Sequence, residues 1–170
     1  MKMIYKIDPQ KLASPVLMWA IVVAGIMFLS VLFKKYGMDG GSILSKPVFQ
    51  NKMTEIFFVP ALFYWIYFFT GAIRVHKEAA KSVSGITKLI MTGVYSSVRH
   101  PIYSADLVLS WGVFFLYPDY FVLLSVLWMD AVLLSWMKIE EKFLLQRFGK
   151  DYKDYMEEVP MFLPGIKNKG

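Results

Sequence analysis

The sequence of 170 residues contains no cysteine and only two histidines. Without cysteine the chain has no disulfide framework and no thiolate for nucleophilic or metal chemistry. Two histidines without a paired spacing are a poor ligand set, so we predict no metal site. Charged residues are also scarce, at 19%, whereas hydrophobic residues reach 56% and mean hydropathy is +0.46. A soluble domain has about 45–50% apolar residues, so the sequence predicts a single integral membrane domain over residues 1–170.

Four apolar runs define the expected fold, which is an all-α integral membrane helical bundle. The first run has 19 residues without a charge, and a helix of that length is about 28 Å long, enough to cross a bilayer. Pro118 and Asp119 lie between the last two runs, and so short a connection predicts a helical hairpin. The last helix is expected to continue past Glu140 and to stop at Gly149, before a cytosolic C-terminal helical lobe. The predicted transmembrane helices cover residues 15–33, 56–73, 101–117 and 121–137.

Basic residues are distributed unevenly between the connecting segments. Segments 1–14, 74–100 and 138–170 together carry 15 of the 19 Lys and Arg residues, and segment 34–55 carries the other four. Because cytosolic loops of membrane proteins are enriched in Lys and Arg, we expect a multi-pass protein with both termini in the cytosol. The net charge of +6 sits between apolar runs, which favours anionic lipid headgroups over nucleic acid as the partner.

The predicted hairpin brings polar residues together at the cytosolic membrane face. Residues at equal distances from the turn lie at one level, so Tyr95 and His100 come close to Glu140 and Glu141. Asp130 precedes Glu141 by about three helical turns and points along the same face. Polar groups at membrane depth are unfavourable unless they face a cavity or a partner. The convergence therefore predicts a site.

Short motifs occupy both arms of this hairpin. The first arm contains Gly93-Val94-Tyr95 and Arg99-His100-Pro101-Ile102-Tyr103, and the second contains Glu140-Glu141 followed by Phe148-Gly149 and Tyr152. In this order and spacing the motifs resemble those of the isoprenylcysteine carboxyl methyltransferase family, and more broadly those of the membrane phospholipid methyltransferases. The resemblance covers residues 80–164, about half of the chain, and marks this stretch as a methyltransferase-like cofactor-binding region.

The resemblance implies methyl transfer from S-adenosylmethionine, bound at the cytosolic ends of the last helices, to a lipophilic or prenylated acceptor. These residue types suit the cofactor. A carboxylate such as that of Glu140 binds its amino group or a ribose hydroxyl, and tyrosine faces attract its sulfonium cation. Carried across by position, the cofactor contacts are Thr87, Lys88, Leu89, Ile90, Tyr95, His100, Pro101, Ile102, Tyr103 and Glu140.

Three further residues are predicted to lie at the acceptor: Asp106, Asp130 and Trp136. Family members that methylate a prenylcysteine carboxylate tend to have an arginine one turn before the cofactor glutamate, and here that position is Trp136. Carboxyl O-methylation is the leading function, and a phospholipid or amine N-methyltransferase is its alternative. Asp106 also follows a stretch similar to that of NADPH-dependent sterol reductases, which gives a second enzyme class. A non-enzymatic membrane packing subunit is the third hypothesis.

Overall fold

The computed structural model describes residues 15–36, 47–49, 52–75 and 89–165. Within these ranges the chain forms helices and no β-strand, in agreement with the expected all-α bundle. Two short 3-10 helices, η2 and η4, precede α3 and α4. The elements are α2 (Pro15–Tyr36), η2 (Lys52–Phe57), α3 (Phe58–Val75), η4 (Gly93–Ser96), α4 (Pro101–Leu116), α5 (Tyr120–Phe148) and α6 (Lys150–Glu158).

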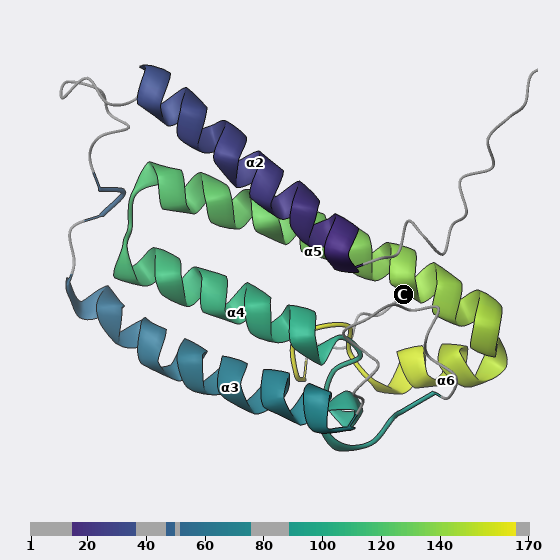
Figure 1. Cartoon of the computed structure of the whole chain (residues 1–170). Coiled ribbons are helices and arrows are strands. Elements are labelled where there is room, and N and C mark those ends of the chain that lie inside the picture. Colours follow the sequence, from purple (N-terminus) through teal and green to yellow (C-terminus); the bar gives the residue numbers. More distant parts are fainter. Residues whose placement is uncertain (1–14, 37–46, 50–51, 76–88, 166–170) are drawn as a thin grey trace, which may run out of the picture.

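Helices α4 and α5 form the predicted hairpin (Figure 1). Asp119 caps the start of α5, where its carboxylate accepts a hydrogen bond of 2.8 Å from the Val122 N–H. The turn is also held from outside, because the Val48 N–H donates to the Pro118 carbonyl at 2.6 Å. At the other end, α5 continues to Phe148 and stops where Gly149 takes φ of +56°, a left-handed conformation that glycine adopts without strain. The predicted end of the helix is therefore confirmed.

The other two long helices flank this hairpin. Helix α3 packs along α4, and α2 packs along α5 (Figure 1). The α3–α4 contact is close at Gly112, where an added Cβ atom would lie 2.7 Å from the Cβ of Ala61. Small residues let helix backbones approach in this way within membranes. This close approach fixes the position of α4, which carries the cavity residues described below.

We expect Gly112→Ala to lower the free energy of unfolding by about 1 kcal/mol. Overpacking costs about 1–3 kcal/mol, and the loss exceeds the roughly 1 kcal/mol that alanine adds in helix propensity. Ser110→Ala in the same helix is the control, because the Ser110 hydroxyl bonds only the carbonyl of Leu107, at 2.7 Å. Unfolding in mixed micelles, followed by tryptophan fluorescence, measures both variants. Equal stability of Gly112→Ala and the wild type would contradict the tight contact.

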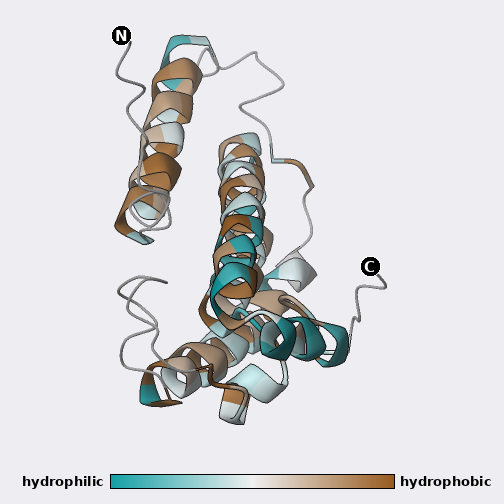
Figure 2. Ribbon diagram, turned by 90° about the vertical axis from the view of Figure 1, so that its right-hand side faces the viewer, coloured by the Kyte–Doolittle hydropathy of each residue, from teal (hydrophilic) through white to brown (hydrophobic). Residues whose placement is uncertain are grey.

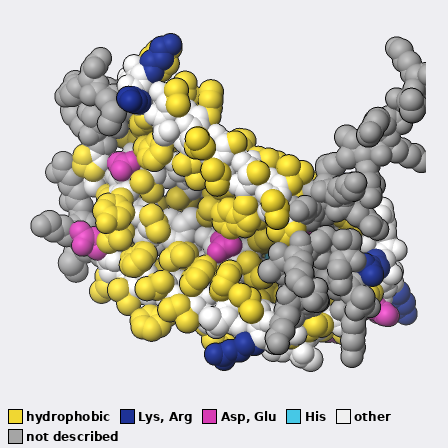
Figure 3. All heavy atoms as spheres, viewed as in Figure 1, with side chains coloured by type: hydrophobic (Ala, Val, Ile, Leu, Met, Phe, Trp, Pro, Cys, Tyr) yellow, Lys and Arg dark blue, Asp and Glu magenta, His cyan; other side chains and the backbone are white. Residues whose placement is uncertain are grey.

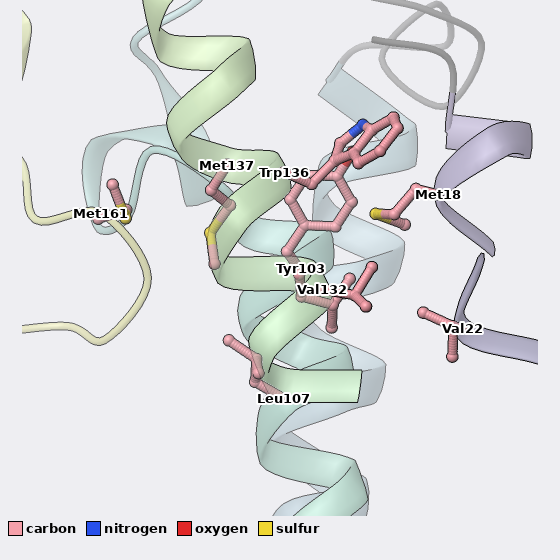
Figure 4. Close-up of a cluster of buried hydrophobic side chains, with 9 residues drawn as sticks. Met18, Val22, Tyr103, Leu107, Val132, Trp136, Met137 and Met161 are labelled. Atoms are coloured by element: carbon pink, nitrogen blue, oxygen red, sulfur yellow. The ribbon is translucent and has the colours of Figure 1, made fainter. Parts of the chain in front are cut away.

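A buried apolar cluster joins α2, α4 and α5. Met18 and Val22 of α2 belong to the same cluster as Leu133, Trp136 and Met137 of α5, and Figure 4 shows Met18 beside Trp136. Residues of α4 and of the segment after α6 complete this cluster, so the N-terminal helix is tied to both arms of the hairpin. The remaining buried members are Tyr103, Leu107, Val132 and Met161.

The outer surface of the bundle is suited to a lipid environment. Among the residues that the structure describes, three helical segments are long and apolar enough to cross a membrane: Pro15–Tyr36, Thr54–Val75 and Tyr120–Phe148. The helix over the third predicted span, α4, is apolar but has 16 residues, which corresponds to about 24 Å against a hydrocarbon core of about 30 Å. Large hydrophobic side chains such as Val16, Met27, Phe28 and Phe63 are more than 60% exposed.

This distribution identifies an integral membrane protein. Figure 2 shows hydrophobic residues dominating the long helices and hydrophilic residues gathering toward one end of the molecule. Figure 3 shows one face covered largely by hydrophobic side chains, with few charges. Both termini, which we predict to be cytosolic, lie outside the described residues, namely in 1–14 and 166–170.

Candidate functional site

The start of α4 is held against the segment that follows α6. The Arg99 N–H donates to the Pro160 carbonyl at 2.9 Å, and the His100 N–H donates to the Met161 carbonyl at 3.0 Å. Pro101 occupies the first turn of α4, where its fixed φ suits a helix and its missing N–H leaves no donor unsatisfied. These contacts set the direction in which Arg99 and His100 project.

Arg99 forms a buried ion pair with Glu141 of α5. Its Nε donates to Glu141 Oε1 at 2.7 Å, and one terminal nitrogen donates to the carbonyl oxygens of Met156, at 2.9 Å, and of Val159. The side chains of Arg99 and Glu141 are 4% and 8% exposed, so each charge depends on the other for compensation. Arg99 therefore ties together the start of α4, the C-terminal half of α5 and the end of α6.

Glu140, the neighbouring carboxylate, has separate partners. The Tyr103 hydroxyl donates to Glu140 Oε1 at 2.6 Å. His100 Nδ1 lies 3.6 Å from Glu140 Oε2, and its Nε2 lies 3.4 Å from Glu141 Oε1 without the geometry of a hydrogen bond. The predicted meeting of the histidine and tyrosine stretch with the two glutamates is thus confirmed.

Three tyrosines from outside the long helices surround this polar group. The Tyr155 hydroxyl of α6 donates to the Tyr95 carbonyl at 2.5 Å, which joins η4 to α6. Burial, reinforced by the charge of Glu140, raises the pKa of Tyr95 to about 12. Burial also raises the pKa values of Tyr152 and Tyr155 above the usual value for tyrosine. All three phenols are therefore neutral at physiological pH, so they present aromatic faces and hydroxyl donors rather than negative charge.

These side chains border a cavity of about 620 Å³, within the usual range of about 300–1,000 Å³ for small-molecule sites. Its polar lining comes from the α4 and α5 region and from α6. Its apolar lining includes Trp19 at the start of α2 and Phe69 of α3. The full set of lining residues is Pro15, Val16, Trp19, Phe69, Leu89, Ile90, Tyr95, Arg99, His100, Pro101, Ile102, Tyr103, Asp106, Glu140, Leu144, Tyr152 and Tyr155.

The structure brings most of the predicted site residues to this one cavity. Thr87 and Lys88 lie outside the described residues. Among the predicted acceptor residues, Asp106 also lines the cavity, whereas Asp130 and Trp136 are not among its lining residues. The predicted cofactor contacts that line it are Leu89, Ile90, Tyr95, His100, Pro101, Ile102, Tyr103 and Glu140.

The two residues outside the cavity have other surroundings. Trp136 lies in the apolar cluster with Met18 and Tyr103 (Figure 4). Asp130 accepts a hydrogen bond of 2.8 Å from Trp111 Nε1. The part of α5 that precedes Glu140 is apolar on most sides, so its sequence does not show which side chains face the cavity. We therefore leave Asp130 and Trp136 out of the proposed site.

Several lining residues were not predicted to belong to the site. Tyr152 and Tyr155 had a usable signal, because they follow Phe148-Gly149 within the motif on the second arm. Trp19 and Phe69 had none, since each is one aromatic residue within an apolar run. Their place at the cavity depends on how α2 and α3 pack against the hairpin, which local sequence does not specify.

Comparison with known proteins agrees with the motifs. The chain is 37% identical over 102 residues to the probable protein-S-isoprenylcysteine O-methyltransferases of Oryza sativa subsp. indica and subsp. japonica, a match that covers 58% of this chain and 49% of each rice protein. It is 32% identical over 90 residues to the methanethiol S-methyltransferase of Pseudomonas deceptionensis, covering 52% of this chain and 32% of that protein. The chain thus spans about half the length of the rice relatives it matches.

A match to a protein family places the chain more firmly than the individual relatives do. Residues 61–151 match the phospholipid methyltransferase family. This stretch is more than half of the chain, and it contains α4, nearly all of α3 and the whole of α5. It therefore includes both glutamates and the Arg-His-Pro segment of the site. On this evidence the chain belongs to the phospholipid methyltransferase family.

Proposed function

We propose that the protein is a membrane methyltransferase that uses S-adenosylmethionine and acts on a lipophilic acceptor. The observation that carries this proposal is the cavity beside Glu140, which combines two carboxylates, four tyrosines and an apolar wall in one space. Family membership supports the reaction class, and the names of the relatives mention sulfur and oxygen acceptors. The activity is part of the proposal, because the match covers 49% of each rice relative and 32% of the methanethiol S-methyltransferase.

Two orphaned polar atoms support the fit of this cofactor to the cavity. His100 Nε2 and the Tyr152 hydroxyl are buried and have no hydrogen-bond partner among the described residues. Buried polar groups normally have partners, and both residues line the cavity. A polar ligand with donors and acceptors, such as a nucleoside bearing an amino acid, would satisfy them.

The lining residues suggest how the cofactor is held. Glu140 is placed to accept hydrogen bonds from its ammonium group or from a ribose hydroxyl. The neutral faces of Tyr95, Tyr152 and Tyr155 suit a sulfonium cation. When bound, S-adenosylmethionine supplies an electrophilic methyl group for a single displacement. The protein then has to align the acceptor and exclude water, and the apolar lining from Trp19 and Phe69 serves this purpose.

Titration calorimetry of the purified protein in lipid nanodiscs tests the proposal. We expect saturable binding of S-adenosylmethionine and of its demethylated product, S-adenosylhomocysteine, and no binding of NADPH. The NADPH titration separates the methyltransferase from the reductase hypothesis. If well-folded protein bound none of the three compounds, a packing subunit would be favoured. If it bound NADPH alone, a reductase would be favoured. Either of those results would overturn the proposal.

The acceptor is the finer question. Carboxyl O-methylation of a prenylcysteine would be favoured by a cation that pairs with the acceptor's carboxylate. Arg99 and His100 are the basic side chains among the described lining residues, and Arg99 is already engaged by Glu141 and two carbonyl oxygens. Methylation of an amine or a thiol needs no such cation, and this difference leads to the next inference.

A further inference from the structure

We propose that Asp106 contacts the acceptor and takes up its proton, so that the acceptor is a lipophilic nucleophile bearing an N–H or S–H group rather than a carboxylate. The inference rests on the proposed function and adds the acceptor class and one catalytic residue to it. Asp106 lies three residues after Tyr103 on α4 and lines the same cavity as Glu140. Tyr103, whose hydroxyl donates to Glu140, thus lies about one helical turn before Asp106 on the same helix.

The carboxylate of Asp106 is fixed by α3. Asp106 Oδ1 accepts a hydrogen bond of 2.9 Å from Trp65 Nε1. The Trp65 ring stacks on Phe69, with ring centroids 4.6 Å apart and planes 15° from parallel. Phe69 itself lines the cavity. One oxygen of Asp106 is thus held by the indole, and its other oxygen accepts no hydrogen bond from the other residues that the structure describes.

The charges around the cavity favour a proton-bearing acceptor. Its described lining contains the two carboxylates of Asp106 and Glu140, and the positive charge of Arg99 is balanced by Glu141 at 2.7 Å. A second negative charge next to Asp106 would be repelled strongly in these apolar surroundings. An ammonium, amine or thiol would instead be attracted, because a carboxylate accepts hydrogen bonds from N–H and S–H groups.

The proposed step balances with these groups alone. The acceptor's nitrogen or sulfur forms a bond to the methyl carbon while the carbon–sulfur bond of the sulfonium breaks, and that bonding pair stays on sulfur to give S-adenosylhomocysteine. The proton of the acceptor passes to Asp106 and then to water. A positioned general base of this kind contributes about 100- to 10,000-fold to a rate. A carboxylate acceptor carries no proton at physiological pH, so it would leave Asp106 without a role.

The chain offers a matched control for Asp106. Asp130 is also half-buried and also accepts an indole hydrogen bond, from Trp111 at 2.8 Å, but it does not line the cavity. Asp106→Asn and Asp130→Asn both keep an oxygen that can accept from the indole. Any general effect of removing a carboxylate from this bundle appears in both variants, and an effect on the acceptor appears only in Asp106→Asn.

Three ten-carbon probes in lipid nanodiscs test the proposal: decylamine, decanethiol and decanoate. With radiolabelled S-adenosylmethionine, we expect the wild type and Asp130→Asn to methylate the amine or the thiol and not decanoate. Asp106→Asn should lose about 100- to 10,000-fold in that rate and keep its affinity for S-adenosylmethionine within about threefold. Binding is measured separately as the shift in unfolding temperature with saturating S-adenosylhomocysteine. There the amine or thiol should stabilise the wild type more than decanoate does, and Asp106→Asn should remove this preference.

Each other result decides against the proposal or against its premise. Preferred methylation of decanoate, an unchanged rate in Asp106→Asn, or binding of S-adenosylmethionine without binding of any amine or thiol probe would overturn the role of Asp106. Failure of the wild type to bind S-adenosylmethionine would overturn the proposed function instead. Should Asp106→Asn not fold, the selectivity of the wild type between decylamine, decanethiol and decanoate decides the acceptor class without it.

Discussion

Replacing Arg99 by Met will lower the free energy of unfolding by about 3–5 kcal/mol, the usual cost of removing one partner from a buried ion pair. The guanidinium bonds Glu141 at 2.7 Å and the carbonyl oxygens of Met156 and Val159. Its loss leaves the Glu141 carboxylate, 8% exposed, without a compensating charge. It also removes the side-chain bonds from the start of α4 to the end of α6, which leaves the backbone bonds to Pro160 and Met161 and loosens the placement of Tyr152 and Tyr155.

A double variant separates the unpaired charge from the lost packing. Arg99→Met combined with Glu141→Gln should be more stable than Arg99→Met alone, because no buried charge remains unpaired. Lys153→Met on the exposed side of α6 is the control for removing a positive charge, and we expect it to change stability by less than about 0.5 kcal/mol. Unfolding in mixed micelles, followed by the fluorescence of the five tryptophans, measures all of them. A stability loss in Arg99→Met no larger than in Lys153→Met would show that the ion pair is not structural.

The hairpin was accessible from sequence because its signals are local. Pro118 and Asp119 between two apolar runs specify a tight turn, and distance from that turn then gives the level of each residue along both helices. This reasoning places Tyr95 and His100 near Glu140 and Glu141, and in the structure the His100 ring lies 3.6 and 3.4 Å from the two carboxylates. It does not predict that the Tyr103 hydroxyl reaches Glu140. The continuation of α5 beyond its apolar run was also predicted from local signals, because helix-favouring residues extend up to Gly149, where the helix ends.

The direction in which each side chain of α5 points around the helix axis could not be predicted from the sequence. A helix that is apolar on nearly all sides carries no periodic signal of which face is buried. Trp136, predicted at the acceptor, instead packs in the apolar cluster. Asp130 and Glu141 do share the side of α5 that faces the α4 arm, where Asp130 accepts from Trp111 and Glu141 accepts from Arg99, but this shared side does not bring Asp130 to the cavity. The wall of the cavity formed by α2 and α3 was missed for a related reason, because it depends on contacts between helices far apart in sequence. A polar residue bound to a nearby tryptophan, as Asp106 is to Trp65, also cannot be recognised from spacing alone.

Replacing Glu140 by Gln will weaken the binding of S-adenosylmethionine by about 10- to 100-fold, whereas the same change at Glu141 will leave affinity within about threefold of the wild type. Hydrogen bonds to charged groups contribute about 1.5–3 kcal/mol. Glu140 lines the cavity and Glu141 does not, although both are buried, at 7% and 6% exposure. Glutamine at position 140 still accepts the bond from the Tyr103 hydroxyl, so this change removes the charge and keeps the shape.

For stability we expect the reverse: Glu141→Gln should lose more than Glu140→Gln. The two variants therefore separate an effect on affinity from an effect on folding. Glu141→Gln leaves Arg99 as an unpaired buried cation, so it should unfold more easily than Glu140→Gln, whose partners are a neutral tyrosine and a histidine at 3.6 Å. Calorimetric titration gives the affinities, and unfolding in mixed micelles gives the stabilities. If both variants lost affinity in proportion to their loss of stability, the two glutamates would act as one structural unit. A cofactor site beside Glu140 instead requires affinity to fail at position 140 and stability to fail at position 141, because only one of these neighbouring carboxylates faces the cavity.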